Sequence, residues 1–315
     1  MIESEITETI KRFSQHKTYE DYEILSYYYW DQVPWSCEKY HQLIGNLLDD
    51  DLILQLIKSL TPISRRPTKL RIDNDEEFAK EKISSIFVLI TYYERHSNWR
   101  IITSNILNLF KNHELQYKIL ACKLLLQLND KIDLDKTGLR QLFVDDLYSC
   151  LTYLPGKLMA QDPTDLIDIS YQTLLEIDHN YTELVNRNLM SIDKVFNRFG
   201  ESHDILHLEL QYLQEIIGRL GIKVLITFNR INFLLNQILI NTYTNESTIT
   251  KILEIQYQVI EMFLDQDQQG KDLMYEYRFD FIGSWKIMTR FHNIDITRNY
   301  QILEKLSDQK LEMSI

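Results

Sequence analysis

The sequence predicts an all-α fold, arranged as an irregular α-solenoid of antiparallel helix pairs. Its 315 residues include only five prolines and eight glycines, and no proline follows Pro163. Strands need frequent turns, whereas a long helix needs only a cap at each end. Apolar residues recur at helical spacing along most of the chain, and short connections between helices favour antiparallel neighbours. No strict period is visible, which indicates irregular helical repeats in one domain spanning residues 1–315.

The expected helices follow from apolar stripes and from residues that begin or end helices. Gly200 and Gly221 are expected to be left-handed caps at helix C-termini. Thr164 and Ser247 are expected to be N-caps. The expected helices cover residues 3–15, 18–30, 36–60, 78–96, 98–110, 115–130, 137–154, 165–178, 182–198, 203–220, 222–243, 248–265, 271–292 and 297–312.

One internal segment, Thr61–Glu77, is expected to be a loop. It carries two prolines, four basic residues and then a cluster of acids, with no helical stripe. Such a composition is typical of a solvated linker. The alternatives are a basic docking patch or a phosphorylatable Thr68 after Arg65-Arg66.

Residues 106–130 predict a helical hairpin. An apolar helix end is followed by a short polar break at Lys111–Glu114 and then by a second helix. The second helix resembles that of a HEAT-type hairpin, in which an apolar–basic pair, here Tyr117-Lys118, opens the helix. Ala121 would let the two helices approach closely, and Leu125 would fill the next layer.

The stretch from Asp135 to Gly156 raises the question of an active site, because it contains two adjacent acids and a cysteine. We expect Thr137 to cap a helix that Pro155-Gly156 ends. Its apolar stripe consists of Leu139, Leu142, Phe143, Leu147, Cys150, Leu151 and Leu154. Asp145 points away from that stripe, at about 200° from Phe143, and neighbouring acids on a helix do not face each other. The segment is therefore expected to be a core helix, with Cys150 as a small buried hydrophobe.

Composition excludes several classes of function. The formal net charge is −12, which argues against a nucleic-acid or anionic-membrane surface, since both need clustered Lys and Arg. No apolar run reaches the about 18 residues of a membrane span, and the N-terminal residues do not form a signal peptide. Three cysteines without an export signal predict reduced thiols in a cytoplasmic or nuclear protein.

Candidates for chemistry are few. The sequence has no glycine-rich phosphate loop, HExxH, CxxC or nucleophile elbow, and no cofactor is expected. His203 and His207 are four residues apart on an expected helix and could share a face as metal ligands do, with Glu201 nearby. These three residues are the only support for the alternative function, an all-α metal-dependent enzyme with a dispersed site.

Two aromatic clusters point to protein binding. The first lies at residues 26–40, and the second lies near the C-terminus. Exposed Tyr, Trp and Arg dominate protein interfaces. The expected protein-binding residues of the second cluster are Tyr277, Arg278, Phe279, Phe281 and Trp285, with Arg290 flanking them. The alternative is that these rings pack at the end of the solenoid, where terminal repeats are atypical.

The segment around residues 106–177 resembles the conserved core of the Tel-two-interacting protein two family. That family shows a Thr-Gly-Leu, then a Phe, then a Leu-x-Tyr-Leu-Pro ending. The matching residues are Thr137, Gly138, Leu139, Phe143, Leu151, Tyr153, Leu154 and Pro155.

The resemblance implies a non-enzymatic subunit of the Triple T (TTT) co-chaperone complex, built of HEAT-like repeats. Its partners would be two larger α-solenoid subunits. Together they would deliver new phosphatidylinositol-3-kinase-related kinases to the heat-shock chaperone machinery. The family offers no catalytic residue, and the matched residues would be structural.

Overall fold

The computed structural model describes residues 50–60, 85–153, 162–198 and 203–306, and every regular element in these ranges is helical. The expectation of an all-α chain without strands is confirmed for these residues. None of the described helices is long and apolar enough to cross a bilayer. The expected helices 3–15 and 18–30, the aromatic cluster at 26–40 and the loop 61–77 lie outside the described residues.

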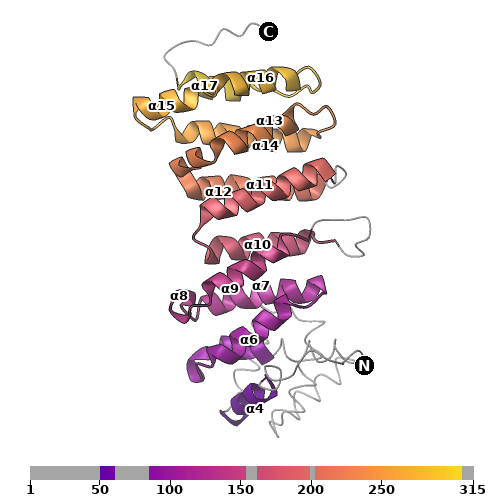
Figure 1. Cartoon of the computed structure of the whole chain (residues 1–315), viewed down its shortest axis with the longest axis vertical. Coiled ribbons are helices and arrows are strands. Elements are labelled where there is room, and N and C mark those ends of the chain that lie inside the picture. Colours follow the sequence, from indigo (N-terminus) through magenta and orange to yellow (C-terminus); the bar gives the residue numbers. More distant parts are fainter. Residues whose placement is uncertain (1–49, 61–84, 154–161, 199–202, 307–315) are drawn as a thin grey trace, which may run out of the picture. The chain divides into compact units, whose positions relative to one another are not determined.

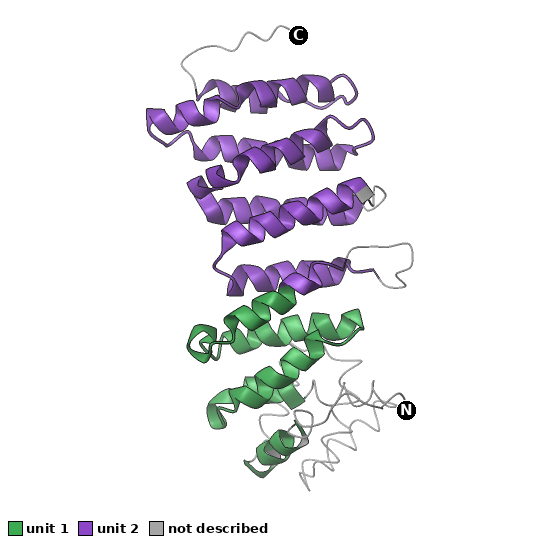
Figure 2. Cartoon of the chain, viewed as in Figure 1, with its two compact units in different colours: residues 1–147 green, residues 148–315 purple. Residues whose placement is uncertain are grey.

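The chain divides into two compact units, residues 1–147 and 148–315 (Figure 2). The division falls within one helix, α9, and the expected single domain stays a prediction. In the first unit, residues 85–91 are also helical. The named elements are α4 (Asp50–Leu60), η2 (Tyr93–Arg95), α6 (Trp99–Phe110), α7 (Leu115–Asn129), α8 (Leu134–Thr137) and α9 (Arg140–Cys150), the last of which continues into the second unit.

The hairpin of α6 and α7 forms as predicted, with its break between Phe110 and Leu115. Ala121 is fully buried, which allows the close approach expected of a small residue at this position. The buried Lys118 donates a hydrogen bond from Nζ to the carbonyl oxygen of Phe110. This lysine thereby satisfies one of the carbonyl groups left free at the end of α6.

Helix α9 presents the buried face that its sequence predicts. Phe143, Leu147 and Cys150 are buried, whereas Asp145 is exposed. Two details of the prediction are wrong. Leu142 is 47% exposed rather than part of the buried stripe. Thr137 ends the short helix α8, because Gly138 breaks the chain there with a left-handed φ of 71°, and α9 begins two residues later.

The second unit contains eight α-helices and one 3-10 helix among its described residues. They are α10 (Thr164–Ile177), α11 (Tyr181–Arg198), α12 (His203–Leu220), η3 (Gly221–Ile226), α13 (Phe228–Leu239), α14 (Glu246–Met262), α15 (Gln268–Tyr275), α16 (Arg278–Met288) and α17 (Thr297–Glu304).

These helices pack in two layers within the unit (Figure 1). One layer runs α10, α12, α14 and α17, and the other runs α11, α13 and α16, with α11 against α12 and α13 against α14 between the layers. Helices α10, α11 and α12 each contact the helix two places along the chain, whereas α13 and α14 contact the helix three places along, because the short α15 intervenes.

Several hydrogen bonds between successive helices of a layer join residues 44 positions apart, and others span 38, 46 or 48 positions. The Tyr212 hydroxyl donates to the Asp168 carbonyl oxygen, and Arg219 donates to the Leu175 carbonyl oxygen. Both pairs are 44 residues apart, as are Arg230 and Asn186 in the other layer. A separation of 44 residues is similar to the about 40–47 residues of one HEAT or armadillo repeat.

Several expected boundaries are wrong. Residues 222–243 form η3 followed by α13, and residues 271–292 form the two helices α15 and α16. Asn245 caps α14 through its side chain, two residues before the expected Ser247. Thr164 is the first residue of α10, not its N-cap. Gly221 adopts the expected left-handed conformation, with a φ of 57°, whereas Gly200 lies outside the described residues.

Candidate protein-binding surface

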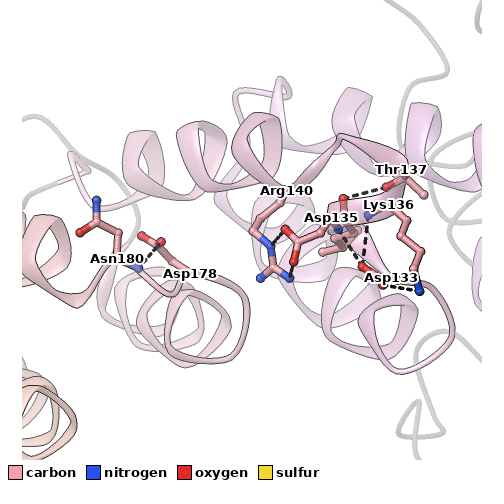
Figure 3. Close-up of polar contacts among 8 residues, drawn as sticks. Asp133, Asp135, Lys136, Thr137, Arg140, Asp178 and Asn180 are labelled. Atoms are coloured by element: carbon pink, nitrogen blue, oxygen red, sulfur yellow. Dashed lines mark hydrogen bonds and ion pairs between the residues drawn. The ribbon is translucent and has the colours of Figure 1, made fainter.

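The segment that carries the family-like motif is held by local polar contacts (Figure 3). The Asp133 side chain accepts hydrogen bonds from the backbone N–H groups of Asp135 and Lys136, so it caps the short helix α8. Thr137 donates its hydroxyl to the Leu134 carbonyl oxygen within the same turn. These contacts satisfy groups that the helix end would otherwise leave unpaired.

An ion pair connects the beginning of α9 to this turn. Arg140 Nε and Nη2 donate to the two carboxylate oxygens of Asp135, at 2.5 and 2.8 Å (Figure 3). The two-point geometry fixes the orientation of the guanidinium group. The contacts within residues 133–140 stabilise the turn on both sides of the left-handed Gly138.

Figure 3 also shows a local hydrogen bond of Asp178, in the second unit. Asp178 Oδ1 accepts a hydrogen bond from the backbone N–H of Asn180 at 2.8 Å (Figure 3). Its other oxygen accepts the hydroxyl of Tyr148 at 2.6 Å. Burial, together with this carboxylate, raises the pKa of Tyr148. The protonated phenol donates this hydrogen bond to the α10–α11 connection.

Two of the predicted protein-binding residues are in the core of the second unit. The side chains of Phe281 and Trp285 are 0% exposed, and their rings stack with centroids 5.7 Å apart. Trp285 Nε1 donates to Gln256 Oε1 on α14 at 2.8 Å. Tyr300 on α17 meets the Trp285 ring edge-on. These contacts are those of terminal packing, the alternative that the sequence left open, and leave neither ring on the surface.

Tyr277 is partly buried at the start of α16. Its ring meets Phe228 of α13 edge-on, with centroids 4.7 Å apart. Tyr277, Phe281 and Trp285 thus form one inward stripe, as their spacing predicts, and this stripe packs against α13 and α14.

Phe279 lies on the other side of this helix, and the partly buried Arg278 reaches toward it. The Phe279 side chain is 70% exposed. The Arg278 guanidinium lies 4.1 Å from the centroid of Phe279 and 4.5 Å from that of Tyr275, and Nη1 also donates to the Tyr275 carbonyl oxygen. The guanidinium group of Arg278 therefore lies over two aromatic rings of its own chain, an arrangement typical of cation–π contacts. We call Tyr275, Arg278 and Phe279 the Arg278 cluster.

A second exposed apolar stripe was not predicted. Phe233 on α13 and Ile240 at its C-terminal end are seven residues apart and exposed, Phe233 at 69%, and Ile226 at the end of η3 is exposed as well. Spacing of seven places residues on one side of a helix. The segment is apolar on two opposite sides, so its periodicity alone does not reveal which side faces the core. In the sequence, the regular spacing of Ile226, Phe233 and Ile240 was the signal that could have indicated these exposed residues.

The structure brings the two candidate metal ligands into one hollow. His203 and His207 both line it, and His207 Nδ1 lies 3.4 Å from Ser247 Oγ. Among the described residues, no group of three His, Cys, Asp or Glu side chains is placed to hold a metal ion. Glu201, the third expected ligand, lies outside the described residues.

No curated protein and no solved structure matches the chain. The model of the Tti2 family matches residues 58–246. The match covers more than half of the sequence and extends on both sides of the motif segment at residues 106–177.

Proposed function

Because the chain belongs to the Tti2 family, we propose that it is a non-enzymatic scaffold subunit of the TTT co-chaperone complex. In this role it binds the larger α-solenoid subunits of that complex. The complex in turn helps phosphatidylinositol-3-kinase-related kinases to mature with the heat-shock chaperone machinery. The family match over residues 58–246 is the observation that carries the proposal.

The fold of the second unit supports a scaffold role. Its two helix layers, linked at a separation of 44 residues, are what a HEAT-like α-solenoid requires. We extend this architecture to the whole chain as part of the proposal. A solenoid offers long surfaces of helix edges, and binding there needs shape and chemical complementarity but no bond chemistry.

We assign the Arg278 cluster as a contact with a partner subunit. It combines an exposed phenylalanine with an arginine that lies over two aromatic rings, and aromatic residues and arginine are enriched at the centres of interfaces. Residues 278 and 279 lie outside residues 58–246, so the family match does not bear on this assignment. The proposed location of the complex is the cytoplasm and the nucleus, where Cys122 and Cys150 would stay reduced.

Affinity purification of the tagged chain from its source cells, followed by mass spectrometry, tests the proposal. We expect two larger helical-repeat proteins to co-purify in stoichiometric amounts, with kinases of the phosphatidylinositol-3-kinase-related class at lower amounts. Recovery of the chain alone, or with unrelated partners, would contradict it. Metal analysis of the same preparation tests the enzyme alternative, which requires a bound metal ion near one per chain.

A further inference from the structure

One of the two layers of the second unit presents exposed apolar side chains, and the other does not. Met190 on α11, Phe233 on α13, Ile240 directly after α13, and Phe279 and Ile287 on α16 are between 39% and 70% exposed. Helices α10, α12, α14 and α17 are fully described, and none of their Leu, Ile, Met, Phe, Tyr or Trp side chains is exposed. We call the five exposed residues the apolar face.

Helices α13 and α16 lie side by side and run in the same direction (Figure 1). Near the beginning of α13, the ring of Phe228 contacts that of Tyr277 on α16. Two turns later, Asn236 of α13 accepts a hydrogen bond from the Ser284 hydroxyl of α16. The exposed phenylalanine of each helix lies between these two contacts in the sequence, so the two rings are at a similar level of the layer.

Helix α11 lies on the other side of α13. Arg230 Nη1 on α13 donates to Asn186 Oδ1 on α11 at 3.3 Å. Short connections join α11 to α12 and α12 to α13, so α11 and α13 run in the same direction. Met190 is about one turn beyond Asn186, and Phe233 is about one turn beyond Arg230. The exposed apolar side chains therefore continue across three neighbouring helices.

The layer with the apolar face is also the positive layer of the unit. Helices α11, α13 and α16 have six basic and three acidic residues, and one of these acids, Glu183, is paired with Arg187. Helices α10, α12, α14 and α17 have three basic and nine acidic residues, besides the buried Glu209. The positive charge thus accompanies the exposed apolar side chains in a chain whose formal net charge is −12.

Four of the five residues of the apolar face have a basic residue within about one turn of the same helix. The pairs are Met190 with Lys194, Phe233 with Arg230, Phe279 with Arg278 and Ile287 with Lys286. A partner that matches this pattern presents apolar side chains with acidic residues beside them. Such electrostatic complementarity selects the partner and fixes its register.

Other occupants match this surface less well. Anionic membranes and nucleic acids are bound by clusters of Lys and Arg, whereas acids lie among the basic residues of this layer. A second copy of the chain would present either its acidic layer, which has no exposed large apolar side chain on its helices, or the same positive layer. Exposed apolar patches bordered by polar residues are typical of protein-binding sites.

We propose that the apolar face binds an acidic, amphipathic segment of a partner protein. Apolar side chains of the segment contact Met190, Phe233 and Phe279, and its carboxylates pair with the neighbouring basic residues. Phe279 also belongs to the Arg278 cluster, so the inference specifies the chemistry of the partner contact assigned there. It rests on the proposed function for the identity of the subunit that supplies the segment.

Fluorescence anisotropy with two labelled peptides tests the chemistry of the segment. Both peptides have 18 residues, the length of α11, and the same leucines on one helical face. The polar positions are Glu in one peptide and Lys in the other. The Glu peptide should bind the full chain at least about tenfold more tightly, and added salt should weaken its binding. Equal binding of the two peptides, or no binding of the Glu peptide, would overturn the proposal.

Substitutions locate the binding of the Glu peptide. Phe233→Ala and Arg230→Glu should each weaken it about tenfold. The matched controls are Tyr243→Ala, which removes an exposed ring outside the apolar face, and Lys251→Glu, which makes the same change of charge on α14. Both controls should bind as the unmodified chain does, and all four melting temperatures should change little. Equal weakening by the controls, or binding to phosphatidylserine vesicles that Phe233→Ala abolishes, would overturn the proposal.

Photo-cross-linking in the purified complex identifies the segment itself. Benzoylphenylalanine replaces Phe233 in the tagged chain, and mass spectrometry identifies what it captures after irradiation. The captured segment should belong to a larger subunit and contain more acidic than basic residues. In a preparation that contains the larger subunits, capture of a basic segment, of a second copy of the chain or of nothing would overturn the proposal. Absence of the larger subunits, with the Glu peptide bound as expected, would contradict the proposed function and leave this surface standing.

Discussion

Tyr171 donates its hydroxyl to the carboxylate of Glu209 across 2.5 Å, and both side chains are fully buried. The two residues are on α10 and α12, 38 positions apart. Asn188 and Ser191 on α11 donate to the same carboxylate. One acid thus receives hydrogen bonds from three donors on two neighbouring helices and connects α10, α11 and α12 inside the second unit.

Stability should fall as pH rises through neutrality because of Glu209. Burial raises its pKa to about 7, although the three hydrogen bonds act in the opposite direction. The pKa of Glu209 is higher in the folded protein than in the unfolded chain. Its contribution to stability is therefore fully present below about pH 4.5 and is lost as pH rises through about 7. For Glu209, the free energy of unfolding should drop by about 2–3 kcal/mol between pH 5 and pH 9.

Glu209→Gln isolates this effect. Its amide oxygen can still accept from Tyr171 and Asn188, and the Ser191 hydroxyl can accept from its NH₂ group. Denaturant unfolding at pH 5 and pH 9 should therefore show a smaller pH dependence for the variant by about 2–3 kcal/mol. The exposed Glu261→Gln is the control and should follow the unmodified chain. An unchanged pH profile for Glu209→Gln would show that this carboxylate does not titrate in that range.

A second pair of substitutions tests the buried face of α9. Leu147 is fully buried, so Leu147→Ala should destabilise the protein by about 2–5 kcal/mol. Asp145 is exposed, and Gln141 donates to it within the same helix, so Asp145→Ala should cost less than about 0.5 kcal/mol. Denaturant unfolding of both variants provides the comparison. Equal losses would mean that the helix faces the core differently.

The Arg278 cluster can be tested with neighbouring phenylalanines. Phe279→Ala removes an exposed ring and should leave the melting temperature within about 1–2 °C, while weakening binding to the larger subunits about tenfold. Phe281→Ala leaves a cavity in the core and should destabilise the protein by about 3–5 kcal/mol. Pull-down and melting temperature are measured for each variant.

These two readouts separate the surface from the core. If Phe279→Ala retains full binding in a preparation where the larger subunits co-purify, the partner contact is elsewhere on the chain. If the larger subunits never co-purify, the proposed complex itself is wrong. Arg278→Lys is a useful third variant, because it keeps the charge but cannot stack between two rings.

The sequence predicted the helical class because apolar periodicity is a local property. The break between Phe110 and Leu115 and the buried face of α9 were both predicted for that reason. The interruption between α15 and α16 was not predicted. Tyr277 there packs on Phe228, nearly fifty residues away, and such a contact leaves no trace in local spacing.

The candidate site was predicted in part, for a related reason. Spacing placed Tyr277, Phe281 and Trp285 on one stripe and Phe279 on another, but it did not say which stripe faces inward. That choice depends on the neighbouring helix α13. Glu209 was missed altogether, since its donors come from two other helices, and a single glutamate on a helix normally predicts a solvated position.

Two glycines should respond to alanine in opposite directions, and they test the backbone of the family-like motif. Gly138 has a φ of 71°, where an L-residue is strained even though open space surrounds the glycine. Gly138→Ala should therefore destabilise the protein by about 1–2 kcal/mol. Gly283 lies inside α16 with nothing within 4 Å of the position that a Cβ would take. Gly283→Ala should stabilise the protein by about 0.5–1 kcal/mol, because alanine loses less conformational freedom in a helix. Denaturant unfolding measures both changes. Stabilisation by both substitutions would mean that the turn before α9 relaxes out of the left-handed conformation, and the Thr137-Gly138-Leu139 motif would then need another physical reason for its glycine.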